Sequence, residues 1–220
     1  MTRAQTLVKI CGLNDAAAVD AAVEAGADYL GFIIFPKSPR HVSPAEAGDL
    51  ARRKGAAKSV AVLVDPDDAL LASVLVQMQP DFIQLHGQES AARCFDARQY
   101  CDEGVWKALG VSAEADLDAV DVYRGRVDGF VFDAKPPKGA DRPGGLGEAW
   151  DYTVLNGFDA GAPWLLAGGL SVESVSEAVA QSGARGVDVV SGTESAPGVK
   201  DPDKIRAFIA AARGPGALAS

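Results

Sequence analysis

The sequence predicts an α/β fold, a single-domain (β/α)8 TIM barrel over residues 1–213, and three observations support this. Short runs rich in Val, Ile, Leu and Phe alternate along the chain with Ala-rich segments of helical periodicity. The runs are apolar nearly throughout, as expected of parallel strands covered on both faces. No linker interrupts the alternation, and 220 residues are enough for one barrel. Residues 214–220 (GPGALAS) are expected to form a flexible tail.

Eight units can be assigned from this alternation. The expected strands are residues 7–11, 29–35, 59–64, 82–86, 105–110, 129–133, 164–169 and 186–192. The expected helices lie near 14–25, 43–54, 67–78, 89–101, 113–123, 148–156, 171–182 and 201–213. Ser43, followed by Pro44 and Glu46, is expected to cap the second helix. Ser171 is expected to cap the seventh in the same way.

An open, doubly wound sheet is the alternative fold. That fold usually has fewer strands and often carries a G-x-G-x-x-G turn after its first strand. The first strand here is followed by GLND instead, which favours the closed barrel.

Composition excludes several classes of function. The net charge of −9 argues against nucleic-acid and anionic-membrane surfaces, because both require basic patches. The first residues lack the apolar core of a signal peptide, and the apolar stretch 70–78 is too short to span a membrane. We therefore expect a soluble, cytoplasmic protein. The chain has an odd and small number of cysteines, which indicates free thiols rather than disulfides. They are Cys11, Cys94 and Cys101, and the last two are expected to have structural roles.

Chemistry-bearing residues gather at the carboxyl ends of the expected strands, where barrels of this kind place their sites. Cys11 ends the first strand and Asp133 ends the sixth. Gln84 and His86 lie on the fourth strand and are expected to line the same mouth. Asp188 on the eighth strand either contacts a ligand there or bonds within the barrel.

Glycine-rich turns follow the seventh and eighth strands. They contain Gly168 and Gly169 in LLAGGLSVESV, and Ser191 and Gly192 in VDVVSGTESAPG. Glycine allows close approach of backbone N–H groups, and a helix expected directly after the first turn adds aligned donors. Two such turns on adjacent strands are typical of the phosphate site of these barrels. We therefore expect a ligand with a phosphate at one end.

Several motifs, in order and spread over almost the whole chain, resemble one family. They are VKICG (8–12), YLGFIIFPKSPRHVS (29–43), VLVD (62–65), IQLHG (83–87), FVFD (130–133), PGGLG (143–147), LAGGL (166–170), GVDVVSG (186–192) and PGVKD (197–201). Together they resemble phosphoribosylanthranilate isomerase, a barrel enzyme of tryptophan biosynthesis.

The resemblance implies an activity and roles for named residues. The expected reaction is the Amadori rearrangement of N-(5-phosphoribosyl)anthranilate to 1-(2-carboxyphenylamino)-1-deoxyribulose 5-phosphate. Cys11 is the implied general base and Asp133 the implied general acid. Arg40 is implied to pair with the anthranilate carboxylate, and His86 to be a polar lining group. No net redox change occurs in this reaction, so no cofactor or metal is implied.

Two positions depart from the family pattern. Leu146 stands in GGLG where GGTG is more frequent, and Val190 stands in DVVSG where DVSSG is usual. Each change removes a hydroxyl, which leaves Ser191 and backbone amides for the phosphate. The Pro- and Gly-rich segment 134–147, which follows Asp133, is an expected lid.

Three other functions are alternatives. Pentose-phosphate epimerases use a metal cluster of His and Asp, whereas this chain has two histidines, His41 and His86. The related isomerase of histidine biosynthesis uses paired aspartates, whereas the first strand here ends in Cys11. A phosphate-ligand sensor without turnover is the non-enzyme alternative. The expected partner is a small phosphorylated substrate, and monomer and homodimer both stay open.

Overall fold

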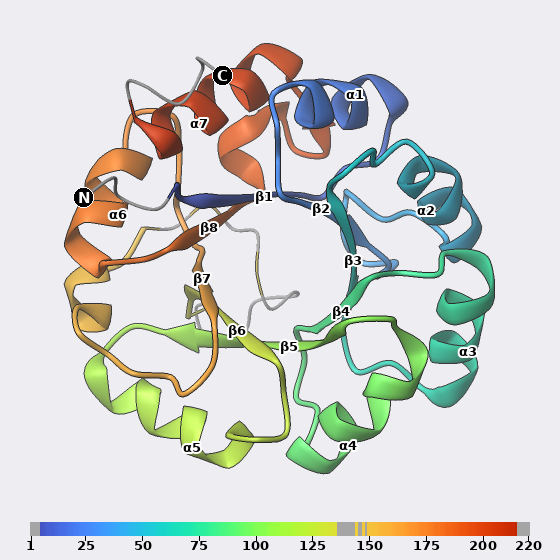
Figure 1. Ribbon diagram of the computed structural model, residues 1–220, viewed down its shortest axis with the longest axis horizontal. Helices are drawn as coiled ribbons and strands as arrows, with labels where there is room; N and C mark the ends of the chain where they lie inside the picture. The colour runs from blue at the N-terminus through green and yellow to red at the C-terminus, as the bar shows by residue number, and fades with distance from the viewer. Residues whose placement is uncertain (1–4, 136–143, 145–146, 148, 215–220) are drawn as a thin grey trace.

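The closed barrel predicted from the sequence is confirmed in a computed structural model, which describes residues 5–135, 144, 147 and 149–214. In these residues eight parallel strands pair in chain order, and β8 returns to β1 to close the ring (Figure 1). The strands are β1 (Leu7–Cys11), β2 (Tyr29–Ile33), β3 (Lys58–Leu63), β4 (Phe82–Leu85), β5 (Gly104–Val111), β6 (Gly129–Ala134), β7 (Trp164–Leu166) and β8 (Gly186–Val189).

Helices cover the outside of this ring, as Figure 1 shows. The α-helices are α1 (Ala16–Glu24), α2 (Pro44–Ala51), α3 (Asp68–Gln77), α4 (Ala91–Asp96), α5 (Val120–Tyr123), α6 (Val175–Ser182) and α7 (Pro202–Arg213). Shorter 3-10 helices are η1 (Ala97–Tyr100), η2 (Glu114–Ala119), η3 (Tyr152–Leu155) and η4 (Ser191–Thr193). In the described part of the chain, no helix combines the length and the apolar character needed to cross a membrane.

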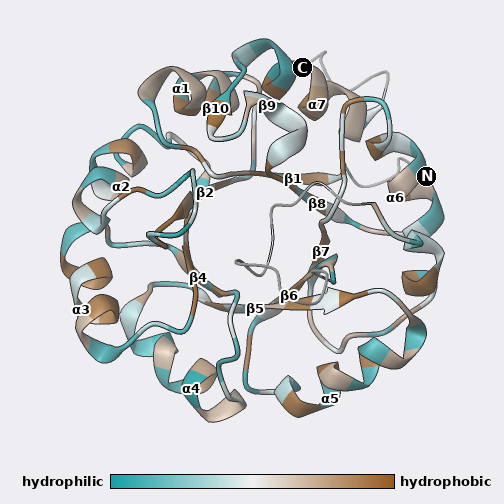
Figure 2. Ribbon diagram, turned by 180° about the vertical axis from the view of Figure 1, so that it is seen from behind, coloured by the Kyte–Doolittle hydropathy of each residue, from teal (hydrophilic) through white to brown (hydrophobic). Residues whose placement is uncertain are grey.

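The strands separate two apolar cores, because successive side chains point to opposite faces of the sheet. The larger core lies between sheet and helices and includes Ile10, Phe132 and Phe208, each at most 1% exposed. The smaller core fills the barrel interior and includes Val60 and Val131. Figure 2 shows the mostly apolar ring of strands inside helices whose polar residues are largely on the outside.

The expected cap of the second helix is confirmed. The Ser43 hydroxyl accepts a hydrogen bond from the Glu46 amide at 3.3 Å, and the Glu46 carboxylate accepts one from the Ser43 amide at 2.8 Å. This reciprocal pair satisfies two amides that the first turn leaves without helical partners.

The helix expected at 148–156 is wrong. The described residues of this segment contain only the 3-10 helix η3, which is followed by Gly157 at φ +78°. The Trp150 indole N–H donates to the Ala167 carbonyl at 3.0 Å, and the Tyr152 hydroxyl donates to the Gly168 carbonyl at 2.6 Å. These bonds to the turn after β7 hold the segment against the barrel in place of a regular helix.

Other boundaries also differ from the expectation. The helix expected at 171–182 is α6, and it begins only at Val175. Residues 172–174 before it form a turn in which the Ser174 amide donates to the Ser171 hydroxyl at 3.3 Å. The helices expected at 89–101 and 113–123 are each part α-helix and part 3-10 helix. An antiparallel pair, β9 (Glu194–Ala196) and β10 (Val199–Lys200), was not predicted. Lys204 of α7 donates to the Glu194 carbonyl at 2.8 Å, and Asn14, just before α1, donates to the Gly198 carbonyl at 2.9 Å.

Two expectations fall largely outside the described residues. Of the expected lid 134–147, the structure describes residues 134, 135, 144 and 147. Of the expected tail 214–220, it describes Gly214, the C-cap residue that follows α7.

Candidate active site

Nine of the ten residues singled out from the sequence line one cavity, whose free space is about 870 Å³ with the open solvent at its mouth included. They are Cys11, Arg40, Gln84, His86, Asp133, Gly168, Gly169, Asp188 and Ser191. These residues come from six strands or the loops after them, and the cavity lies at the carboxyl ends of the strands. The tenth, Gly192, does not line this cavity.

Cys11 reaches the cavity from the end of β1 and is 2% exposed. Its neighbour in the sheet is Gly31 of β2, where a Cβ atom would come within 2.7 Å of the Cys11 sulfur. Gly31 therefore makes room for the thiol. Burial raises the pKa of Cys11 above its ordinary value, and the positive charge of Lys9 opposes that rise.

Asp133 approaches from the opposite side of the ring, at the end of β6. Its Oδ1 accepts a hydrogen bond from the Ala134 amide at 2.8 Å, and its Oδ2 lies 3.5 Å from Nε2 of His86. Nδ1 of the same ring lies 3.2 Å from the Gln84 amide nitrogen. With that amide as donor, His86 carries its proton on Nε2, facing the carboxylate. Gln84, His86 and Asp133 thus form one polar chain.

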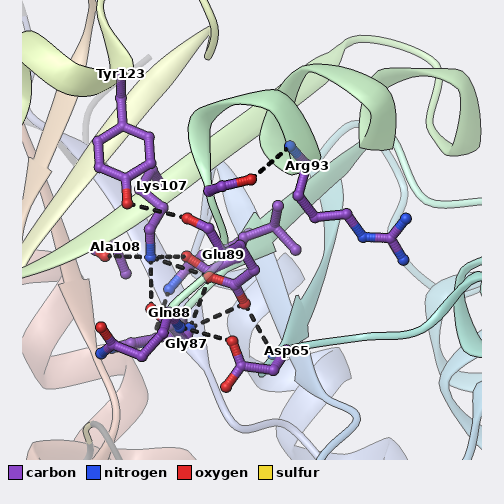
Figure 3. A network of polar contacts seen from close by, with 12 residues as sticks. Asp65, Gly87, Gln88, Glu89, Arg93, Lys107, Ala108 and Tyr123 are labelled. Atoms are coloured by element: carbon purple, nitrogen blue, oxygen red, sulfur yellow. Dashed lines mark hydrogen bonds and ion pairs between the residues drawn. The ribbon is translucent and has the colours of Figure 1, made fainter.

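The loop that carries His86 is fixed by a buried ion pair outside the cavity (Figure 3). Nζ of Lys107 lies 3.1 Å from the Glu89 carboxylate and also donates to the carbonyls of Gly87 at 2.9 Å and Ala108 at 3.0 Å. Glu89 in turn accepts the amides of Gly87 and Asp65. Both charged side chains are at most 2% exposed. The ion pair therefore holds in place the loop after β4, which carries His86.

A second buried pair lies inside the barrel. Nζ of Lys9 is 2.9 Å from Oδ2 of Asp188, across the junction of β1 and β8. Lys9 is completely buried; burial alone would lower its pKa, but the Asp188 carboxylate and Cys11 outweigh this and raise it. Asp188, which the sequence left open between a ligand and a partner within the barrel, has the partner and also lines the cavity.

A third cluster of charged side chains forms around Arg40, which is 3% exposed. Its Nε and Nη2 donate to the two carboxylate oxygens of Glu194 at 2.6 and 2.8 Å. Nζ of Lys200 lies 3.5 Å from the same carboxylate, and it donates to the Val190 carbonyl at 2.6 Å and the Thr193 hydroxyl at 3.1 Å. This network joins the loop after β2 to the turn after β8.

The two glycine-rich turns pack against each other. Gly168 and Gly169 have φ of +83° and +65°, a region that favours glycine. A Cβ atom on Gly192 would come within 2.0 Å of the Leu170 carbonyl oxygen, so only glycine allows the turns this contact. Val190 and Ser191 complete the lining beside them, whereas Leu146 lies outside the described residues.

Lys9, Glu194 and Lys200 were not predicted from the sequence. A lysine inside an otherwise apolar strand, as in LVKIC, is a signal that could have indicated Lys9. Glu194 and Lys200 lie in an unpredicted hairpin, and only the fold brings them to Arg40. Within the part of the chain that the structure describes, no three His, Cys, Asp or Glu side chains are grouped as metal ligands would be.

Comparison with known proteins finds relatives that match nearly the whole barrel. The sequence model of the family described as N-(5'phosphoribosyl)anthranilate (PRA) isomerase matches residues 8–211. An N-(5'-phosphoribosyl)anthranilate isomerase of Paracoccus denitrificans (strain Pd 1222) is 53% identical over 210 residues, 94% of this chain and 97% of the relative. Phosphoribosyl anthranilate isomerase from Thermotoga maritima superposes with a TM-score of 0.84 at 34% identity, covering 94% of this chain and 98% of that one.

A further solved structure carries a ligand. It is a phosphoribosyl anthranilate isomerase in complex with reduced 1-(o-carboxyphenylamino)-1-deoxyribulose 5-phosphate. It superposes with a TM-score of 0.81 at 31% identity, covering 94% of this chain and 98% of that one. The likeness in sequence and in structure therefore extends over nearly the whole chain.

Proposed function

The chain belongs to the N-(5'-phosphoribosyl)anthranilate isomerase family, and on this premise we propose that it is the aldose–ketose isomerase that acts on this substrate in tryptophan biosynthesis. Cys11 is the general base and Asp133 the general acid. One observation carries the assignment: these residues, far apart in the sequence, line the same cavity from β1 and β6.

The proposed chemistry moves protons without an external oxidant or reductant. Asp133 in its acid form gives a proton to the ring oxygen, so that the C1–O bond breaks while the nitrogen lone pair forms a C1–N double bond and the nitrogen becomes positively charged. The Cys11 thiolate then takes the proton from C2. The electron pair of that C–H bond forms the C1–C2 double bond, and the nitrogen becomes neutral. Tautomerisation of this enolamine gives the ketone. No cofactor or metal is required by these steps.

Two buried acceptors support binding of the sugar between acid and base. Oε1 of Gln84 and Oδ1 of Asp188 are buried and have no hydrogen-bond partner among the described residues, and both side chains line the cavity. Sugar hydroxyls would satisfy these oxygens, whose burial is otherwise unfavourable. His86 lines the cavity beside them, and we assign it to substrate binding rather than to proton transfer.

The two ends of the substrate have separate sites in this proposal. The phosphate binds at the turns after β7 and β8, where Gly168, Gly169 and Ser191 line the cavity and glycines let backbone amides approach an anion. The anthranilate carboxylate binds near Arg40, whose planar guanidinium suits carboxylate geometry and is held in place by Glu194. The partner is thus a small phosphorylated molecule rather than a nucleic acid or a membrane, and the cytoplasm suits such an enzyme.

The test is a fluorescence assay that follows loss of phosphoribosylanthranilate on mixing with purified protein. Replacing Cys11→Ala or Asp133→Asn should lower turnover at least ~10²-fold, because positioned acid and base groups each contribute about that much. Cys101→Ala, which changes a thiol outside the cavity lining, should retain turnover. Circular dichroism checks that each variant folds.

Three results would alter the proposal. Near-normal turnover in either cavity variant would refute the role of that residue. A folded wild-type protein without turnover would instead indicate the phosphate-ligand sensor. Turnover of the aminoaldose of histidine biosynthesis, in addition to this substrate, would indicate a bifunctional isomerase.

A further inference from the structure

The position of Lys9 places a positive charge inside the barrel next to the proposed base. Lys9 precedes Cys11 by two residues on β1, so both side chains point to the same face of the sheet. Cys11 belongs to the interior core, which is otherwise built from apolar side chains such as Val60, Val131 and Leu165. Lys9 is 0% exposed. The thiol therefore shares its buried surroundings with a cation.

The pair of Lys9 with Asp188 is poorly explained by stability alone. Burying two charges costs several kcal/mol of free energy per ion, and apolar residues of similar volume are often as stabilising. Moreover, Oδ1 of Asp188 has no hydrogen-bond partner among the described residues. An apolar pair would lack the charge itself. Because Lys9 and Cys11 lie on the same face of β1, that charge lies near the thiol.

We propose that Lys9 activates Cys11 through its charge: the buried ammonium stabilises the thiolate, and Asp188 holds the ammonium in place. This inference rests on the proposed function, in which Cys11 must be ionised to take the C2 proton. A buried thiol would otherwise stay protonated, since burial raises its pKa. In the activation step the Cys11 S–H bond breaks heterolytically, its proton passes to water, and Lys9 keeps its own proton. Lys9 is thus a positioning residue rather than a catalytic one.

The other charges near Cys11 fix the sign of each effect. Lys9 on β1 and Lys200 on β10 favour the thiolate, whereas Asp188 on β8 disfavours it. Among these three groups Lys9 has the largest influence. Across the cavity Asp133 and His86 act on Asp188 with opposite signs. Removing Lys9 should therefore raise the pKa of Cys11, and removing the charge of Asp188 should lower it.

The experiment titrates the thiol without substrate. Absorbance of the thiolate at 240 nm is measured against pH, with the Cys11→Ala protein subtracted so that other thiols and tyrosines cancel. Lys9→Met should move the Cys11 midpoint upward by about one pH unit or more, which is a tenfold loss of thiolate below the midpoint. Asp188→Asn should move it downward. Lys58→Met, which removes a lysine at the other end of the barrel, should leave it unchanged.

A second variant covers the case in which Lys9→Met does not fold because Asp188 is left unpaired. Lys9→Met/Asp188→Leu replaces the pair by apolar residues. Its Cys11 midpoint should still lie above that of the wild type, because Lys9 affects the pKa of Cys11 more strongly than Asp188 does. A folded variant lacking Lys9 that titrates like the wild type would refute the inference. Failure of the proposed function is distinguishable, because it appears as normal turnover in Cys11→Ala whatever the titration shows.

Discussion

Lys200 lies under the turn that follows β8, with its charge directed at the main chain there. Nζ donates to the Val190 carbonyl at 2.6 Å and the Thr193 hydroxyl at 3.1 Å. Burial lowers the pKa of Lys200 to about 8, against the opposing effect of Glu194. Its charge is therefore lost in a pH range where an enzyme can still be studied, so the contribution that we propose for it to anion binding can be measured.

We predict that anion binding at this turn weakens as pH rises through about 8. Sulfate is a suitable probe because it keeps its charge between pH 7.5 and 9.5. Its dissociation constant, measured by calorimetry, should rise several-fold over this range in the wild type, since the folded protein loses the Lys200 proton. Lys200→Met should bind more weakly at pH 7.5 and show a flatter profile. Lys58→Met should keep the wild-type profile, and an equally steep profile in Lys200→Met would contradict the prediction.

Residues that end a strand could be predicted as cavity lining from sequence, whereas their buried partners could not. Cys11 and Asp133 were found because strand ends meet at one rim in a barrel. The partner of Lys9 is 179 positions away and that of Arg40 is 154 positions away. Such pairs depend on which strands become neighbours and in what register, which no local pattern contains.

At the scale of elements, the pair of Lys107 and Glu89 ties β5 to the loop after β4. The Tyr123 hydroxyl of α5 adds a bond to the Glu89 carbonyl at 3.0 Å, so a helix, a strand and a loop meet at this point (Figure 3). The Lys107 ammonium also lies 5.7 Å from the centre of the Tyr123 ring. Because the pair is buried, removal of one partner leaves a charge without compensation.

We predict that Lys107→Met lowers the free energy of unfolding by about 3–5 kcal/mol, the usual cost of breaking a buried ion pair. Lys107→Met/Glu89→Gln should recover a large part of this, because the Gln side chain is neutral and still offers an acceptor oxygen to the loop amides. Urea unfolding at neutral pH measures both variants. Arg52→Ala, which breaks an ion pair with Asp49 at the surface, should cost less than about 1 kcal/mol. Equal losses for Lys107→Met and Arg52→Ala would contradict the prediction.

Elements with strong local signals were predicted well, and those shaped by distant contacts were not. Ser43 and Glu46 lie three residues apart and form their capping box as expected. The helix predicted for the segment with Trp150 and Tyr152 was wrong, because the indole N–H and the phenol hydroxyl of these residues bond to the turn after β7. The hairpin of β9 and β10 escaped because two strands of two or three residues have too little periodicity to detect.

At the scale of the whole molecule, the barrel is complete only when the last elements meet the first. β8 pairs with β1, and α7 lies beside α1 (Figure 1). Arg213 at the end of α7 bonds to the Gly26 carbonyl and, at 3.0 Å, to the Asp28 carboxylate. Phe208 on α7 is 0% exposed and belongs to the core outside the sheet. Chain ends far apart in sequence therefore share one packing unit.

This closure predicts that damage at α7 weakens the entire ring rather than one edge. Phe208→Ala should lower the free energy of unfolding by about 3–5 kcal/mol, because it leaves a cavity in a core that cannot fully collapse. Far-UV circular dichroism and tryptophan fluorescence should show one coincident transition in urea, since Trp106 and Trp164 lie on other parts of the barrel wall. Val76→Ala, at a position 74% exposed on α3, should change stability by no more than about 0.5 kcal/mol. Separate transitions for the two probes in Phe208→Ala would mean that α7 detaches alone, and that the ring of strands persists without the helix covering its closure.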